Sequence, residues 1–159
     1  MRSGRCIVSG LEADSHTWNL VFIQLLLQEC DFEVLNLGPC VPALLLAETI
    51  AVWEPDLVVI STVNGCCGVQ GKGLISALAA QLERPLPPMI IGGILTTSTG
   101  GEQAARLELL RAGYRGVFVG EDSKVEFVQF LNDWKRQHRV SKPLGNLERF
   151  PPQLVRPEL

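Results

Sequence analysis

Asp14 and His16 stand two residues apart in the polar segment that follows the first apolar run of the chain. In an extended loop, residues i and i+2 point the same way, so this carboxylate can bond one imidazole nitrogen. Such a bond fixes the tautomer and leaves the other nitrogen free, and more basic, as a metal ligand. The pair suits a single axial bond to a metal that a macrocycle already holds, whereas zinc takes three or four protein ligands. On the pair alone, a surface histidine held by its own loop is the simpler interpretation.

The segment that begins at Gly10 does not have the pattern of a nucleotide-binding loop. It contains neither the G-x-G-x-x-G turn of dinucleotide-binding folds nor the G-x-x-x-x-G-K-[ST] phosphate loop. The net charge is −3 and the Lys and Arg residues are scattered, so we expect no nucleic acid partner.

The cysteine pattern predicts reduced thiols in a cytoplasmic protein. The five cysteines are Cys6, Cys30, Cys40, Cys66 and Cys67. Their number is odd, they form no C-x-x-C pair, and we find no signal peptide. For Cys66 and Cys67, small and partly buried thiols are favoured over a redox or second-metal role. The longest apolar stretches, 20–27 and 41–53, are too short to span a bilayer and are interpreted as buried helices.

Turn residues divide the chain into five strand–helix units. The predicted strands are 6–10, 32–37, 57–60, 89–91 and 116–119, and the predicted helices are 18–30, 42–53, 74–82, 102–112 and 123–139. We place Pro42 in a first helical turn, 68–73 in a flexible loop, Gly113 at a helix C-terminus and Ser123 at a helix N-cap. Residues 1–140 form the predicted domain, and the proline-rich tail, 141–159, wraps the surface or a partner.

This alternation predicts an α/β fold of the flavodoxin-like (Rossmann-like) kind, with a five-stranded parallel sheet and helices on both faces. In such sheets ligands bind beyond the carboxyl ends of the strands, near the switch point between the first and third. The two early helices are apolar nearly all round. A second copy or a larger partner would cover their outer faces, or the helices pack on each other and on the tail.

Three short motifs follow three of the predicted strands: Asp14-Ser15-His16 after the first, Ser61-Thr62-Val63 after the third, and Gly92-Gly93 after the fourth. Together they resemble the D-x-H-x-x-G…S-x-L…GG signature of the cobalamin-binding domain family, over residues 4 to 139. Two positions depart from it. Asn19 stands where the signature has Gly, adding bulk where the nucleotide tail of the cofactor enters, and Val63 stands where it has Leu.

The resemblance implies that cobalamin binds with its tail detached from cobalt and threaded between the sheet and a helix. His16 would then be the lower cobalt ligand and Asp14 its hydrogen-bond partner, while Ser61 would bond the displaced base. Gly92 and Gly93 would let the tail pass, and Ser123 would bond it. The full expected cofactor-binding set is Asp14, Ser15, His16, Thr17, Ser61, Val63, Gly65, Gly92, Gly93 and Ser123. No residue of this chain is expected to be catalytic.

Within the family, a chain of this length that starts directly with the strand most resembles the small subunit of glutamate (methylaspartate) mutase. That resemblance implies adenosylcobalamin, a radical carbon-skeleton rearrangement (an isomerase reaction) and a large barrel-type catalytic subunit, without which the chain is inactive. Three alternatives stay open. They are a cobalamin carrier or sensor, a methyltransferase corrinoid protein (which usually carries a helical segment ahead of this domain), and a flavodoxin-like module that binds no corrin.

Overall fold

The computed structural model describes residues 4–65 and 68–138. The strands are β1 (Arg5–Ser9), β2 (Glu33–Asn36), β3 (Leu57–Thr62), β4 (Met89–Gly93) and β5 (Gly116–Phe118). The helices are α1 (Trp18–Glu29), α2 (Ala43–Trp53), α3 (Gly68–Gln81), α4 (Glu102–Ala112) and α5 (Ser123–Gln137). All pairings are parallel and the strand order is β2-β1-β3-β4-β5, which confirms the flavodoxin-like prediction.

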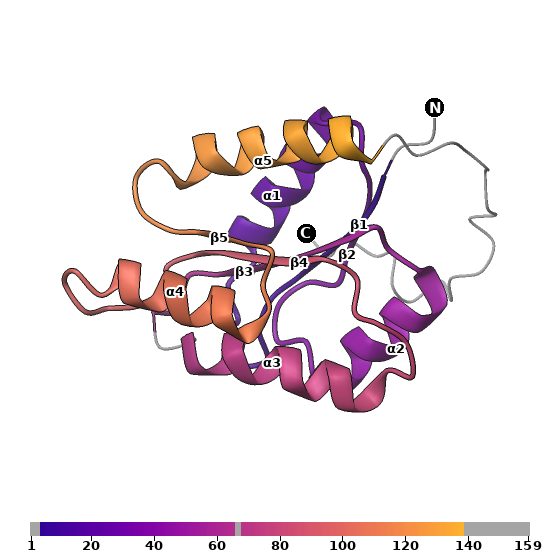
Figure 1. Cartoon of the computed structure of the whole chain (residues 1–159), viewed down its shortest axis with the longest axis horizontal. Helices are drawn as coiled ribbons and strands as arrows, with labels where there is room; N and C mark the ends of the chain where they lie inside the picture. Colours follow the sequence, from indigo (N-terminus) through magenta and orange to yellow (C-terminus); the bar gives the residue numbers. More distant parts are fainter. Residues whose placement is uncertain (1–3, 66–67, 139–159) are drawn as a thin grey trace.

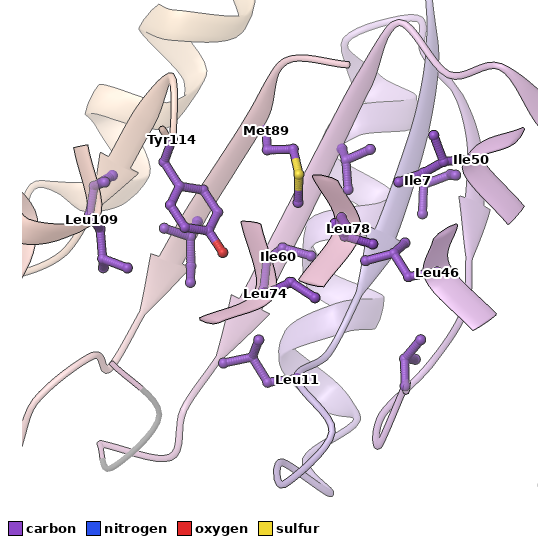
Figure 2. Close-up of a cluster of buried hydrophobic side chains, with 14 of the residues drawn as sticks. Ile7, Leu11, Leu46, Ile50, Ile60, Leu74, Leu78, Met89, Leu109 and Tyr114 are labelled. Atoms are coloured by element: carbon purple, nitrogen blue, oxygen red, sulfur yellow. The ribbon is translucent and has the colours of Figure 1, made fainter. Parts of the chain in front are cut away.

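The sheet lies between two helical layers, with α1 and α5 on one face and α2, α3 and α4 on the other (Figure 1). Because side chains of a strand alternate between faces, the core divides into two clusters. Cys6, Val8, Leu57, Val59 and Ile90 pack toward α1 and α5. Ile7, Val58, Ile60, Met89 and Ile91 pack toward the other layer, several of them shown in Figure 2.

The carboxyl end of β3 is the centre of the edge at which all five parallel strands end. β3 is buried along its whole length and pairs with β1 on one side and β4 on the other. By the same alternation, Ser61 shares the face of Val59 toward α1 and α5, whereas Thr62 shares the face of Ile60. The loop with Asp14 and His16 leaves β1 beside this end, at the switch point of the sheet.

The predicted flexible loop at 68–73 is wrong, because these residues form the first turns of α3. Gly71 is buried there, and a Cβ on it would lie 3.0 Å from Cδ1 of Ile91 and 3.2 Å from Cδ2 of Leu109. The glycine allows close packing of the helix against β4 and α4, and does not break the helix.

Helix termini differ from the prediction in two places. The N-cap of α5 is Asp122, so Ser123 is the first helical residue and makes no capping bond. Pro42 is likewise the N-cap of α2 and does not lie in its first turn. Gly113 does end α4 in the left-handed conformation (φ 119°), as predicted. The tail, 141–159, lies outside the described residues.

Apolar side chains remain exposed on α1 and on α2. Trp18 (85%), Phe22 (47%) and Leu25 (56%) are exposed on α1, and Leu44, Leu45 and Val52 on α2. The two helices lie on opposite faces of the sheet, so they do not cover each other as one of the alternatives required (Figure 1). Among the helices that the structure describes, none has the length and apolarity needed to cross a membrane.

The backbone conformation and surroundings of Gly93, at the end of β4, leave no room for a side chain. Its φ is +113°, and a Cβ on it would overlap the carbonyl oxygen of Thr62. We expect Gly93→Ala to lower the free energy of unfolding by at least about 2 kcal/mol, because it combines backbone strain with a clash against β3. Urea denaturation followed by circular dichroism measures this. Gly73→Ala is the matched control, since a Cβ there meets nothing within 4 Å. Equal stabilities of the two variants would contradict the expectation.

Candidate functional site

Asp14 is a buried carboxylate (1% exposed) whose two oxygens are both engaged. Oδ2 accepts hydrogen bonds from the Thr62 hydroxyl (2.5 Å), from Val63 N (2.9 Å) and from Asn64 N (3.3 Å). Oδ1 accepts one from His16 N (3.0 Å) and lies 2.6 Å from His16 Nδ1. The carboxylate therefore joins the loop after β1 to the end of β3 and orients the imidazole at the same time.

The hydrogen bonds keep this carboxyl ionised. Burial by itself raises the pKa of Asp14. The bonds from Thr62, from both groups of His16 and from the Val63 backbone outweigh burial and hold the pKa well below its usual range. Near neutral pH, Asp14 is therefore a charged acceptor that favours a proton on His16 Nδ1.

The imidazole of His16 points its other nitrogen outward. The side chain is 59% exposed, and no described residue hydrogen-bonds Nε2. With Nδ1–H donated to Asp14, the neutral ring carries a free lone pair on Nε2. No group of three His, Cys, Asp or Glu side chains gathers for a metal ion within residues 4–65 and 68–138. Chemically, Nε2 of His16 can act as a single nitrogen donor.

Three further contacts fix the backbone around Asp14. Cys40 N donates to the carbonyl oxygen of Asp14 (3.0 Å). Asn64 Nδ2 donates to the carbonyl of Ala13 (3.3 Å), and Gln70 Oε1 accepts from Ala13 N (3.4 Å). These bonds come from segments after β2, after β3 and in α3, so the histidine loop is held by three other parts of the chain.

A cavity of about 180 Å³ lies beside this loop, between the sheet and the α1–α5 layer. It is lined by Asn19, Phe22, Ile23 and Leu26 of α1, Val59, Ile60, Ser61 and Val63 around the end of β3, Ile90, Ile91, Gly92 and Gly93 of β4, Phe118 of β5, and Ser123, Lys124 and Phe127 of α5. The lining is chiefly apolar, with a few polar groups. A binding site for a flat organic group has this character.

Asn19 forms the polar end of the cavity together with Ser61. Its Nδ2 donates to Ser61 Oγ (2.9 Å), while its Oδ1 is buried and has no hydrogen-bond partner among the described residues. The sequence predicted only added bulk at Asn19, so its bond to Ser61 was missed. Thr62 was missed as a partner of Asp14 as well. The alternation of β3 was the available signal, because it turns Thr62 away from the face that Ser61 shares with the cavity.

The structure brings most of the predicted residues into two adjoining groups. Asp14, His16 and the backbone of Val63 form the anchor of the imidazole, and Ser15 and Thr17 are exposed on either side of His16. Ser61, Val63, Gly92, Gly93 and Ser123 line the cavity. Gly65 lies elsewhere, against Thr97 and beside a second cavity near α3 and α4. Cys66 and Cys67 lie outside the described residues.

The two glycines at the end of β4 have a structural reason of their own. A Cβ on Gly92 would come 2.9 Å from the carbonyl oxygen of Phe118, and one on Gly93 would overlap that of Thr62. Neighbouring strands therefore require glycine at both positions, whether or not a ligand passes along them. Because the glycines also line the cavity, they leave its floor open at the β4 edge.

No family model and no curated protein matches the chain. Among solved structures, it is similar to a novel cobalamin-binding protein from Desulfitobacterium hafniense (TM-score 0.63, 20% identity, 82% of this chain and 60% of that one). A methanol:cobalamin methyltransferase complex from Methanosarcina barkeri gives a TM-score of 0.58, with 16% identity over 88% of this chain and 52% of that one. A CheY-like protein from Pseudomonas aeruginosa gives 0.55, with 20% identity over 82% and 94%.

These similarities establish the fold. The chain spans less than two thirds of the length of the two cobalamin-related chains. A CheY-like protein shares the same arrangement of sheet and helices, so the similarity shows the fold and does not identify a ligand.

The acidity of Asp14 predicts a pH-dependent contribution to stability. Because its folded pKa lies below the unfolded value, this contribution is fully present above about pH 4 and is lost as the pH falls toward the folded pKa. We expect Asp14→Asn to cost about 1–3 kcal/mol at pH 7, since an amide cannot accept all of these bonds. The stability difference between the variant and the wild type should narrow below about pH 4, because the Asp14 carboxyl of the unfolded wild-type chain takes up a proton there while the folded one stays ionised.

Denaturant midpoints measured from pH 7 down to pH 3 give this comparison. Asp133→Asn is the control, because Asp133 is exposed (57%) and contacts only Arg136 at 3.6 Å among the ion pairs of the described chain. A gap between Asp14→Asn and wild type that stays constant over the whole pH range would contradict an ionised Asp14 as its cause.

Proposed function

We propose that this chain binds cobalamin with the nucleotide tail detached from cobalt and with His16 as the lower ligand. The observation that carries the proposal is an exposed imidazole, oriented by a buried carboxylate at 2.6 Å, beside an apolar cavity at the switch point of the sheet. A corrin would bring most of the ligands of its cobalt with it, so one protein nitrogen would be enough to hold the metal. That is the ligand His16 Nε2 offers.

The cavity residues fit the detached tail. The aromatic and aliphatic walls suit a flat base, and Ser61 and Asn19 supply hydrogen-bonding groups at one end. The unpaired Oδ1 of Asn19 is a further polar group for a ligand to satisfy. Gly92, Gly93 and Ser123 would border the tail. Val63 would also border the tail, and Ser15 and Thr17, exposed on either side of His16, would contact the corrin.

Bound cobalamin would supply the organometallic chemistry, and this chain would hold and orient it. Asp14 would keep the proton on Nδ1 of His16 and so keep Nε2 available as a ligand. Two structurally similar proteins are described as cobalamin-binding or as part of a cobalamin methyltransferase complex, which supports this cofactor. We propose a cytoplasmic location on the basis of the cysteine pattern.

As its biological role, we propose that the chain is the cobalamin-binding part of an adenosylcobalamin-dependent carbon-skeleton mutase resembling glutamate (methylaspartate) mutase. The loop that carries His16 contains no arginine that would bind the carboxylate of an amino acid substrate. A large barrel-type catalytic subunit would provide that site. Exposed Trp18, two residues from the ligand, together with Phe22 and Leu25, offers an apolar surface for such a partner or for a second copy of the chain.

A methyltransferase corrinoid protein is the second candidate, favoured by the similarity to a methanol:cobalamin methyltransferase complex. The two roles differ in the upper ligand of cobalt, which would be adenosyl in a mutase and methyl in a methyltransferase. If the mutase proposal holds, the chain loaded with adenosylcobalamin and mixed with its candidate catalytic partner should rearrange glutamate. Transfer of the methyl group of methylcobalamin to an acceptor, with no rearrangement, would favour the second role instead.

The His16 assignment is tested by His16→Ala. After incubation with hydroxocobalamin and desalting, the wild type should retain the corrinoid with a tail-off, histidine-ligated visible spectrum. His16→Ala should lose that spectrum and bind at least about tenfold more weakly, because the lower bond to cobalt is missing. In the reduced Co(II) form, ¹⁵N-labelling of histidine should change the nitrogen splitting in the electron paramagnetic resonance spectrum of the wild type.

His138→Ala is the control, because the second histidine stacks on Trp134 at the end of α5 and lies outside both groups of site residues. If the wild type retains no corrinoid, alone or with its partner, the cobalamin proposal fails. If His16→Ala keeps the histidine-ligated spectrum, the ligand assignment fails while cobalamin binding stands.

A further inference from the structure

Asn19 brings an amide into a cavity whose other walls are largely apolar. It lies in the first turn of α1, and its Nδ2 is used by Ser61 Oγ at 2.9 Å. Its Oδ1 is buried without a partner among the described residues. Buried carbonyl oxygens of this kind are normally paired, because in a low-dielectric interior an unpaired one costs free energy.

The surroundings of the amide offer few donors. Phe22 and Ile23, one turn further along α1, also line the cavity and cannot donate a hydrogen bond. Ser123 and Lys124 of α5 are lining side chains that can donate, but neither bonds Asn19 Oδ1. Ser61 already accepts from Nδ2, and its own hydroxyl hydrogen remains available to donate to a ligand. The polar end of the cavity therefore combines one free donor, on Ser61, with one free acceptor, on Asn19.

We propose that Asn19 selects the lower base of the corrinoid, favouring a base that carries an N–H donor, such as adenine, over dimethylbenzimidazole. This inference rests on the proposed binding of a corrinoid with its tail in the cavity. Dimethylbenzimidazole, once attached to its ribose, has a ring-nitrogen acceptor but no N–H group. Adenine has ring-nitrogen acceptors for Ser61 and an exocyclic amino group that can donate to Asn19 Oδ1.

Size favours the same base. Asn19 occupies space that a glycine at this position would leave open, and the cavity is about 180 Å³. Adenine lacks the two methyl groups of dimethylbenzimidazole, so it demands less of the space beside the amide. Adenine would donate a hydrogen bond to Asn19 Oδ1, whereas dimethylbenzimidazole would leave this oxygen buried and unpaired.

Equilibrium dialysis with three corrinoids tests the proposal. The probes are cobalamin, the corresponding cobamide with an adenine base, and cobinamide, which has no base. We expect the wild type to bind the adenine cobamide about tenfold more tightly than cobalamin, the range expected for one or two hydrogen bonds in an apolar site. Asn19→Leu, which keeps the branched shape of the side chain and removes the amide, should reduce the difference to twofold or less.

Asn19→Gly is the second variant, in case the leucine does not fold, and circular dichroism checks both. It should also lose the preference and bind cobalamin more tightly than the wild type does, since the bulk of the amide is gone. Equal affinities of the wild type for the two base-carrying corrinoids would overturn the proposal, and so would a preference for cobalamin. A preference that both variants retain would show that other residues set it.

Cobinamide separates this inference from the proposed function. Its binding depends on His16 and on the corrin contacts, and not on the cavity. If cobinamide binds and the two base-carrying corrinoids are not distinguished, only the role of Asn19 fails. If none of the three binds to wild type, the corrinoid proposal and the inference fall together.

Discussion

The carboxylate of Asp14 is the interaction on which the site depends. It is buried, accepts bonds from the Thr62 hydroxyl and from two backbone amides after β3, and still has an oxygen for His16. A charge in that position is stable only because every one of these donors is in place. The cost of burying it is therefore offset by the same contacts that fix the loop, so the orientation of the imidazole is coupled to the integrity of the β1–β3 edge.

The other half of the site, the cavity, depends on apolar packing and not on a buried charge. The cavity between the sheet and the α1–α5 layer is formed by apolar side chains and by two glycines that the neighbouring strands require. Its polar side chains are few: Asn19 and Ser61, which bond each other, and Ser123 and Lys124 of α5. Shape and a few hydrogen bonds govern this half, whereas charge governs the half around Asp14. The β3 strand joins them, because Ser61 serves the cavity and Thr62 serves the carboxylate.

Much of this arrangement could be predicted from the sequence, because it follows from local patterns. The turn residues and apolar runs gave the order of elements, and the spacing of Asp14 and His16 gave their contact. What failed depended on tertiary packing. Gly71 looked like part of a loop, and only the nearness of Ile91 and Leu109 explains a glycine inside a helix there. Thr62 and Asn19 have ordinary polar side chains whose partners, Asp14 and Ser61, are 48 and 42 residues away in the chain.

The alternation at the end of β3 has a consequence for how such a site can evolve. Ser61 and Thr62 are joined by one peptide bond, yet they act on opposite sides of the sheet. Mutations around Ser61 can reshape the cavity without disturbing the donors of Asp14, and the reverse also holds. Related sequences could therefore change the cavity around Ser61 while the loop with Asp14 and His16 stays nearly constant, since the two sets of residues depend on opposite faces of the same strand.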